Sequence, residues 1–253
     1  MNLNDKVIVI TGGGQGLGRA MALFLAEKGA TPALIDMNPA ALDETVGLCL
    51  EKGVQARAYV ANVADEQSVA DVFNNIVADF GAIHGLINNA GITRDAMFIK
   101  AKDGEVTQRM SLQQWQQVID VNLTGVFLCG REAATKMIET GSEGAIINIS
   151  SISRAGNMGQ SNYSAAKAAV VALTTTWAKE LSRFGIRTGA IAPGFIGTEM
   201  VMSMKPEALD KMTSGIPAKR VGDPSEIAHA VAFILENDYF SGRVVEVDGA
   251  LRL

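Results

Sequence analysis

The stretch KVIVITGGGQGLGRA, residues 6–20, runs from a short apolar segment through a glycine-rich turn into a helical pattern. Its glycines allow the backbone to turn tightly and to approach a ligand closely. A helix that begins in such a turn offers free N–H groups to a phosphate. Because the turn follows a strand pattern and opens a helix pattern, it predicts a dinucleotide-binding site. A tight turn without a ligand is the alternative interpretation.

Apolar runs rich in Val and Ile alternate with longer helical patterns along the rest of the chain. The runs are continuous, which is typical of strands buried on both faces of a parallel sheet. We therefore predict an α/β fold: a single doubly wound, Rossmann-type domain over residues 1–253, with a mostly or wholly parallel sheet of about seven strands. The expected strands are residues 6–11, 31–36, 55–61, 83–89, 145–150, 186–193 and 242–248.

Asp36 ends the second expected strand, 24 residues after Gly12. A carboxylate at that place can accept both hydroxyls of an adenosine ribose. It would repel a 2′-phosphate about 4 Å away by roughly 4 kcal/mol at an effective dielectric constant near 20. The next residue is Met37, so no arginine directly follows to hold a phosphate. Asp36 therefore predicts NAD(H) in preference to NADP(H), and it can also cap the helix expected to begin at Pro39.

Composition excludes several other classes of protein. The chain of 253 residues has a net charge of −5, and no basic run indicates a nucleic-acid or membrane partner. Cys49 and Cys129 lie in apolar helical patterns and are expected to be free thiols. The first residues lack a signal-peptide pattern, which favours the cytoplasm. His84 and His229 have no metal-ligand spacing, so no metal site is expected.

The stretch SNYSAAKAAV, residues 161–170, places Tyr163 and Lys167 one turn apart on one face of an expected helix. Taken alone, such a pair is usually a coincidence on a solvated face. A phenol held beside an ammonium can instead serve as an acid/base group, because the positive charge favours the phenolate.

Six short motifs then occur in one order: TGGGQGLG (11–18), NNAG (88–91), VNLTG (121–125), NISS (148–151), YSAAK (163–167) and PGFIGT (193–198). Together they resemble the short-chain dehydrogenase/reductase family, most closely its 3-oxoacyl-(acyl-carrier-protein) reductases and related NAD-dependent alcohol dehydrogenases. The resemblance extends from about residue 5 to the C-terminus.

The resemblance implies an enzyme that transfers a hydride between nicotinamide and a ketone or secondary alcohol. The implied catalytic residues are Asn122, Ser151, Tyr163 and Lys167. The implied cofactor-binding residues are Gly12, Gln15, Gly16, Leu17, Gly18, Asp36, Asn62, Val63, Asn89, Ala90, Gly91, Tyr163, Lys167, Pro193, Gly194, Ile196 and Thr198. Residue 62 is Asn where the family commonly has Asp. The resemblance also suggests a homotetramer, with residues 111–139 and the Tyr163 helix forming one interface.

Two adjacent serines compete for the role of binding the substrate oxygen. Counting back from Tyr163 selects Ser150, whereas the order within NISS selects Ser151. A loop absorbs a one-residue deletion more easily than a buried strand changes register. Ser151 is therefore the predicted residue.

Three further segments bear on the substrate. Residues around 100–109 are extra relative to the family pattern, with a turn at Asp103-Gly104; they would cap the pocket, extend a subunit contact or form an inert excursion. Residues 196–215 are expected to form a mobile, methionine-rich lid over an apolar substrate, and ordinary helix packing of the methionines is the alternative interpretation. The acidic stretch 139–144 argues against a dedicated acyl carrier protein partner, because that partner is itself acidic.

Alternatives remain for the substrate and for the class of protein. A small ketone, a steroid or a sugar alcohol would replace the acyl thioester without changing the chemistry. A methyltransferase shares the glycine turn and the acidic residue after the second strand, but it has no use for a Tyr-x3-Lys helix. A non-enzymatic NAD sensor would not need Asn122, Tyr163 and Lys167.

Overall fold

The structure is a computed structural model that describes residues 1–252, apart from the side chains at positions 200 and 208. Within this range seven parallel strands form one sheet in the order β3-β2-β1-β4-β7-β8-β9. They are β1 (Val7–Thr11), β2 (Thr31–Asp36), β3 (Arg57–Val60), β4 (Gly85–Asn88), β7 (Gly144–Ile149), β8 (Ile186–Pro193) and β9 (Arg243–Val247). The predicted doubly wound parallel sheet is confirmed, and the expected strands differ from the observed ones by at most two residues at either end.

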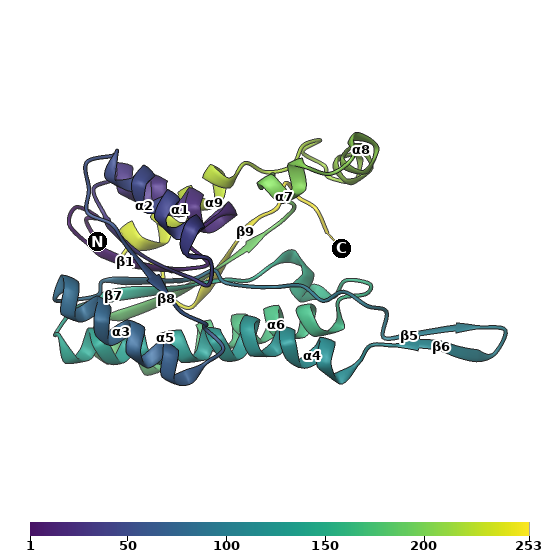
Figure 1. Cartoon of the computed structure of the whole chain (residues 1–253), viewed down its shortest axis with the longest axis horizontal. Coiled ribbons are helices and arrows are strands. Elements are labelled where there is room, and N and C mark those ends of the chain that lie inside the picture. Colours follow the sequence, from purple (N-terminus) through teal and green to yellow (C-terminus); the bar gives the residue numbers. More distant parts are fainter. Residues whose placement is uncertain (253) are drawn as a thin grey trace.

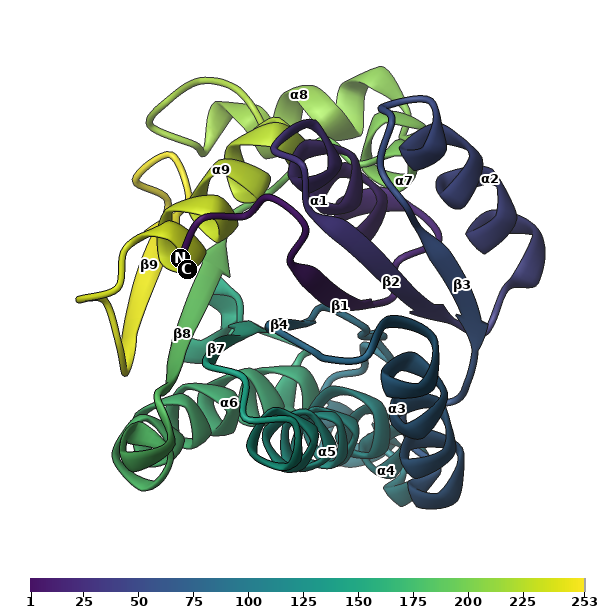
Figure 2. The same ribbon diagram turned by 90° about the vertical axis from the view of Figure 1, so that its left-hand side faces the viewer.

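Helices cover both faces of the sheet (Figures 1 and 2). One layer holds α1 (Gly16–Glu27), α2 (Pro39–Leu50) and α9 (Pro224–Glu236). The other holds α3 (Glu66–Phe80), α4 (Leu112–Ile119), α5 (Gly125–Glu139) and α6 (Ser161–Glu180). Two short helices, α7 (Glu199–Met202) and α8 (Pro206–Ser214), follow β8.

Alternate side chains of the central strands enter two separate cores. In β1, Ile8 and Ile10 pack with α1 and α9, whereas Val7 and Val9 pack with α3 and α5. Because both faces of the strand are covered by helices, both sets of side chains are apolar. This explains why the strands appear in the sequence as unbroken apolar runs.

The strand order reverses between β1 and β4, since β2 follows β1 on one side and β4 lies on the other. Ligands of open α/β sheets bind at such a point, beyond the carboxyl ends of the strands. The glycine turn after β1 and the NNAG segment after β4 lie there side by side.

The helix expected over 111–139 is interrupted near its middle. A π-helical turn, Asp120–Thr124, separates α4 from α5 and contains Asn122. Single π-turns inside α-helices occur mostly at functional positions. The spacing of apolar residues in the sequence does not reveal this π-helical turn, because one extra residue in a single turn changes that spacing very little.

The extra residues form a hairpin of β5 (Ile99–Lys102) and β6 (Glu105–Arg109) that extends away from the body (Figure 1). Asp103 and Gly104 have φ angles of 51° and 83°, which is the left-handed conformation that a two-residue hairpin turn requires. The turn predicted at these residues is therefore present.

No helix over the described residues is both long and apolar enough to cross a lipid bilayer.

His84 makes the fold sensitive to acid. Its Nδ1 accepts a hydrogen bond from the Val7 N–H at 3.2 Å, and burial together with Lys6 lowers the pKa of the ring. The neutral ring thus stabilises the folded state at neutral pH. Histidine in the unfolded chain takes up a proton near pH 6.5, so this contribution begins to be lost as the pH falls below about that value. The loss continues as the pH falls through the lower pKa that His84 has in the folded protein.

We therefore expect the free energy of unfolding of the protein to fall between pH 7.5 and pH 5.5 by more than that of His84→Gln. Since the ring is partly exposed, solvent screening keeps the difference below about 1 kcal/mol. Urea unfolding at the two pH values measures it, with the exposed His229→Gln as the control. An equal pH dependence in His84→Gln and the unaltered protein would contradict the assignment.

Candidate active site

The glycine turn brings β1 and α1 into close contact. Gly12 has a φ angle of 64°, a conformation that side chains disfavour. A Cβ atom on Gly18 would lie 1.9 Å from the Gly12 carbonyl oxygen, so only glycine allows the helix to pack on the turn. Gln15, the residue before α1, makes no side-chain cap. The first N–H groups of α1 are thus free to meet an anion.

Asn89, directly after β4, holds this turn in place. Its side-chain amide donates to the carbonyl oxygens of Thr11 and Gly12 at 3.0 and 3.2 Å. Thr11 in turn accepts from the backbone N–H groups of Asn89 and Ala90, both at 3.0 Å. These bonds join the ends of β1 and β4 at the point where the strand order reverses.

The carboxylate of Asp36 is fixed at the end of β2 by two backbone donors. Its Oδ2 accepts from the Gly14 N–H and its Oδ1 from the Asn38 N–H, both at 3.1 Å. The helix cap expected of Asp36 belongs instead to Asn38, whose side chain accepts from the Ala41 N–H at 3.2 Å. Asp36 lies too early in the chain to reach that N–H group and faces the cavity.

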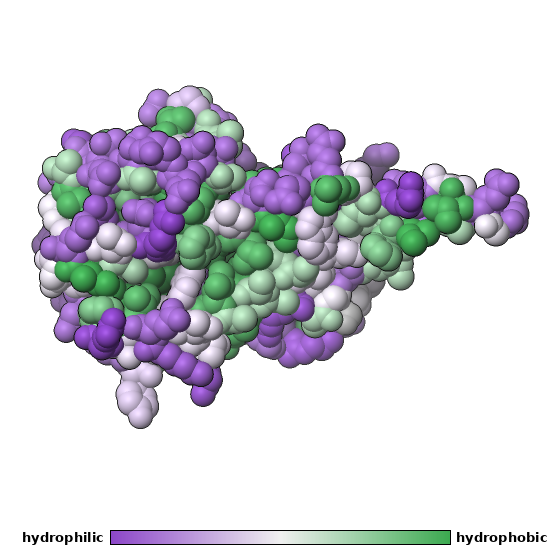
Figure 3. Space-filling model, turned by 90° about the horizontal axis from the view of Figure 1, so that it is seen from below, coloured by the Kyte–Doolittle hydropathy of each residue, from purple (hydrophilic) through white to green (hydrophobic). Residues whose placement is uncertain are grey.

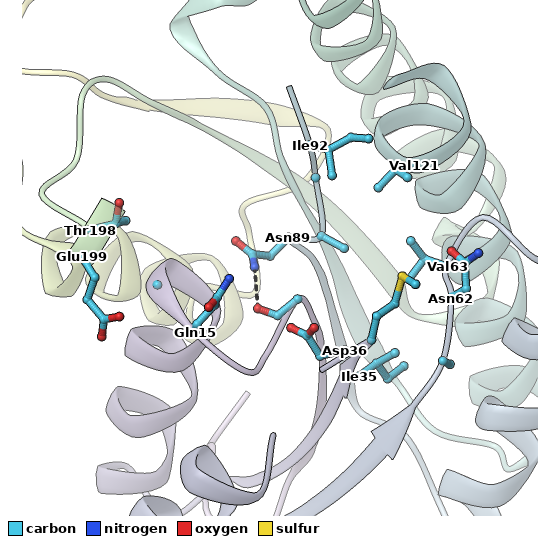
Figure 4. A pocket seen from close by; sticks show the side chains of 16 residues that line it. Gln15, Ile35, Asp36, Asn62, Val63, Asn89, Ile92, Val121, Thr198 and Glu199 are labelled. Carbon is cyan, nitrogen blue, oxygen red and sulfur yellow. Dashed lines mark hydrogen bonds between the residues drawn. The ribbon is translucent and has the colours of Figure 1, made fainter. Parts of the chain in front are cut away.

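A cavity of about 410 Å³ lies over these residues (Figure 4). Ile35, Val63 and Val121 give it apolar walls that suit a flat heterocycle, and Asp36 lies on its edge. Ten residues predicted to bind the cofactor line it: Gly12, Gln15, Gly16, Asp36, Asn62, Val63, Asn89, Ala90, Gly91 and Thr198.

Arg19 lies close to the same loop, but its guanidinium is already engaged. It donates to the Gly14 carbonyl oxygen at 2.9 Å and to both carboxylate oxygens of Glu44 at 2.7 and 3.1 Å. Thr45 also accepts from Arg19 and donates to the same Gly14 oxygen. Arg19 therefore supports the turn and is neutralised by Glu44.

A second cavity, of about 650 Å³, adjoins the first and shares Gln15, Asn89, Gly91, Ile92 and Thr198 with it. The predicted residues Ser151, Tyr163 and Lys167 lie together in its wall. Four more predicted residues line it: Leu17, Pro193, Gly194 and Ile196.

The two serines differ in what their hydroxyls contact. The Ser150 hydroxyl is buried and donates to the Lys167 carbonyl oxygen at 2.8 Å, which ties the end of β7 to α6. The Ser151 hydroxyl accepts from the Ser153 N–H at 3.1 Å and lies beside the Tyr163 phenol, whose pKa it lowers. Only Ser151 therefore presents its hydroxyl next to the candidate acid.

Burial controls the charge of the Tyr–Lys pair. It raises the pKa of the Tyr163 phenol, an effect that the Ser151 hydrogen bond opposes and the Asp95 carboxylate reinforces. It also lowers the pKa of Lys167 to about 8. The Lys167 ammonium lies 5.6 Å from the centre of the Tyr163 ring and donates to the Ile149 carbonyl oxygen at 2.7 Å. It thus contacts the ring face without bonding the phenol oxygen, so the phenol is neutral near pH 7.

Asn122 is completely buried and lies behind the cavities rather than in their walls. Its Oδ1 accepts from the Ile92 N–H at 2.9 Å, and its Nδ2 donates to the Ile92 carbonyl oxygen at 3.0 Å. The π-turn thereby holds the chain that crosses the pocket after Gly91. Gly18 also lies outside both cavity walls and acts through helix packing.

Some contributors to the site carry no clear signal in the sequence. Thr11 is the first residue of the TGGGQGLG motif, but as the last residue of an apolar strand it gives no sign that its hydroxyl joins β1 to β4. Asn162 donates to the carbonyl oxygens of Arg94 and Gln114, and thus anchors the start of α6 next to Tyr163. Further residues that line the second cavity are Arg94, Asn157, Gln160 and Phe195 from loops and Val201 from α7.

The site fits a dinucleotide by the chemistry of its donors and acceptors. Free N–H groups at α1 suit a pyrophosphate, the Asp36 carboxylate suits ribose hydroxyls, and the apolar wall suits a base. Over residues 1–252, no three His, Cys, Asp or Glu side chains are grouped so that they would hold a metal ion.

Known proteins share this arrangement over nearly the full chain. The family model described as short chain dehydrogenase matches residues 6–209. A 3-oxoacyl-(acyl-carrier-protein) reductase FabG of Thermotoga maritima is 39% identical over 254 residues, with 99% of both chains covered. A (3R)-3-hydroxyacyl-CoA dehydrogenase of Canis lupus familiaris is 39% identical over 262 residues, covering 99% of this chain and 98% of the relative.

The solved structure of a levodione reductase is similar with a TM-score of 0.89 and 37% sequence identity, covering 98% of this chain and 97% of that one. The resemblance read from the six motifs is confirmed. The chain belongs to the short-chain dehydrogenase/reductase family, whose members bind a nicotinamide cofactor and interconvert small carbonyl compounds and alcohols.

Proposed function

We propose that the protein is an NAD(H)-dependent reductase of 3-oxoacyl thioesters, acting reversibly on the corresponding 3-hydroxyacyl compounds. The observation that carries the proposal is the convergence of Ser151, Tyr163 and Lys167 on one cavity beside the dinucleotide cavity. Relatives named for 3-oxoacyl and 3-hydroxyacyl substrates, each 39% identical, support this substrate class. An NADH-oxidation screen across 3-oxoacyl thioesters, cyclic ketones, steroids and sugars tests it.

Each residue has a distinct task in carbonyl reduction. The cofactor, when bound, supplies the hydride. Ser151 donates a hydrogen bond to the substrate carbonyl oxygen, and Tyr163 delivers a proton to the same oxygen. The raised pKa of Tyr163 suits this role, because the phenol carries its proton at neutral pH. Lys167 holds α6 against the end of β7 and places its positive charge beside the ring.

The segment 196–215 is proposed as a mobile lid over the substrate. Val201 of α7 lines the second cavity, so the side chain already faces the site. Met202 and Met204 are exposed to 55% and 38% and offer a pliable apolar surface for an acyl chain.

We also propose a cytoplasmic homotetramer in which α5 and α6 form one interface. Phe127 and Ile138 are exposed on α5, as an interface between subunits would require.

NADH should be preferred over NADPH by at least tens-fold in kcat/KM. The Asp36 carboxylate is fixed by two N–H groups and would meet a 2′-phosphate at close range, where like charges repel by roughly 4 kcal/mol at an effective dielectric constant near 20. Asp36→Ala should narrow the preference, and adding Glu44→Gln, which frees Arg19, should narrow it further. Steady-state kinetics with both cofactors measure this, with the exposed Asp43→Ala as the control. Equal use of the two cofactors by the unaltered protein would rule the assignment out.

A carrier protein should bring no advantage. The basic residues Arg187 and Arg220 are already engaged, Arg187 with carbonyl oxygens of α9 and Arg220 with Glu226. A 3-oxoacyl-CoA substrate should therefore be reduced about as well as the same acyl chain on acyl carrier protein. Competition kinetics with the two substrates measure this. A large kcat/KM advantage for the carrier-linked chain would overturn it.

A further inference from the structure

The hairpin β5–β6 has a surface that the rest of the described chain does not cover. Every residue of both strands is exposed, and neither strand pairs with the seven-stranded sheet. An isolated two-stranded hairpin is marginally stable in water. Phe98 and Val106, which are 70% and 60% exposed, leave large apolar side chains in solvent.

The two faces of the hairpin have different chemistry. Residues directly opposite each other in an antiparallel pair lie on the same face. One face therefore carries Ile99, Ala101 and Val106, joined by Arg109 at its root. The other face carries Lys100 opposite Gln108 and Lys102 opposite Glu105. This division is typical of strands that are covered on one side only.

We propose that the apolar face of this hairpin packs on a second copy of the same chain. The charges favour such an occupant: residues 97–110 contain three basic and two acidic side chains, a net charge of +1, so the rest of the chain carries −6. The hairpin of one copy is thus attracted to the body of another copy and not to a second hairpin.

A second uncovered apolar surface lies on the same side of the molecule. Figure 3 shows apolar residues on the hairpin and, beyond its root, over the helices of the adjoining layer. Leu112 at the start of α4 and Phe127 and Ile138 on α5, two helices of that layer, are exposed. A second copy of the chain that packs on this helix layer also lies next to the hairpin, so a single interface covers both apolar surfaces.

The root of the hairpin touches the rim of the substrate cavity. Ala96 donates its N–H to the Gly159 carbonyl oxygen at 2.9 Å, and Asp95 accepts from Gln160, which lines that cavity, at 3.0 Å. The surface contact and the candidate active site are therefore linked through the start of α6. The proposal itself rests on the exposed faces and not on the reaction, so a failure of the proposed function leaves it standing.

A matched pair of variants tests the proposal. Val106 and Gln108 are both exposed on β6. The register of the hairpin shifts by one residue between them, so Val106 lies opposite Ala101 and Gln108 opposite Lys100, and their side chains lie on opposite faces. Val106→Asp and Gln108→Asp introduce the same charge. We expect Val106→Asp to weaken self-association at least about ten-fold, since burying a valine contributes about 1.5–3 kcal/mol and 1.4 kcal/mol is a factor of ten. Gln108→Asp should leave it within about two-fold of the unaltered protein, because a rim charge contributes little.

Sedimentation velocity over a concentration series measures the association. A monomeric unaltered protein, or equal association of the two variants and the unaltered protein, would overturn the proposal.

Photo-crosslinking identifies the occupant. Cys49 and Cys129 are buried, so a benzophenone maleimide reacts selectively with a new exposed thiol. Val106→Cys labelled in this way should yield a covalent dimer whose crosslinked peptides come from the body of a second copy, and labelled Gln108→Cys should yield much less. Crosslinks confined to the same chain, or equal dimer yields from the two positions, would show that this face does not pack on a second copy.

Discussion

Tyr163→Phe should lower kcat by about a hundred- to ten-thousand-fold, the range that a positioned general acid contributes. The variant keeps the ring that Lys167 contacts at 5.6 Å and loses only the phenol oxygen that carries the proton. NADH binding should be nearly unchanged, because the glycine turn and Asp36 are untouched. Single-turnover kinetics and NADH fluorescence titration measure the two quantities.

Two comparisons sharpen this experiment. Tyr239 is fully exposed, so Tyr239→Phe should leave kcat unaltered and controls for the general effect of removing a phenol. Lys167→Ala should reduce both kcat and NADH affinity, because Lys167 is predicted to bind the cofactor and also places its charge beside the Tyr163 ring. Substantial turnover by Tyr163→Phe would show that another group delivers the proton.

Ser151→Ala should cost about a hundred-fold in kcat, the scale of losing one donor to a developing oxyanion. Both serines line the cavity, but the Ser151 hydroxyl lies beside the Tyr163 phenol, where the substrate oxygen would be held. Steady-state kinetics at saturating NADH measure the loss.

Ser150→Ala provides the matched comparison, because the same group is removed one residue earlier. Its hydroxyl bonds the Lys167 carbonyl oxygen in the protein interior, so its loss should lower the free energy of unfolding by about 1 kcal/mol and affect kcat much less. A larger kcat loss in Ser150→Ala than in Ser151→Ala would reverse the assignment of the two serines.

The two serines show which features of the site the sequence can predict and which it cannot. The strand pattern predicts that neighbouring hydroxyls at the end of β7 lie on different faces, and this much depends only on backbone geometry. Which face meets the cavity depends on α6, which packs against that strand from a distant part of the chain. The hydrogen bond from Ser150 to the Lys167 carbonyl oxygen exists only after that packing.

The pKa values of the Tyr–Lys pair depend on burial in the same way. Spacing alone predicts an ammonium beside a phenol and hence a lower phenol pKa. In the fold, burial raises the pKa of Tyr163 and lowers that of Lys167, so the expected lowering of the phenol pKa is wrong. The exposure of a side chain depends on every element packed around it, so the spacing of two residues on one helix cannot predict it.

By itself, the sequence determined the sheet, the glycine turn, the carboxylate at Asp36 and the Tyr163–Lys167 face. Each of these follows from local rules: the period of apolar residues, the conformational freedom of glycine and the rise of a helix turn. Only the tertiary structure decided that Asn122 supports Ile92 from a π-turn, that Glu44 occupies Arg19, and that residues 99–109 form a projecting amphipathic hairpin. These features join residues that are distant in the chain or depend on what covers a surface, and no local pattern records such contacts.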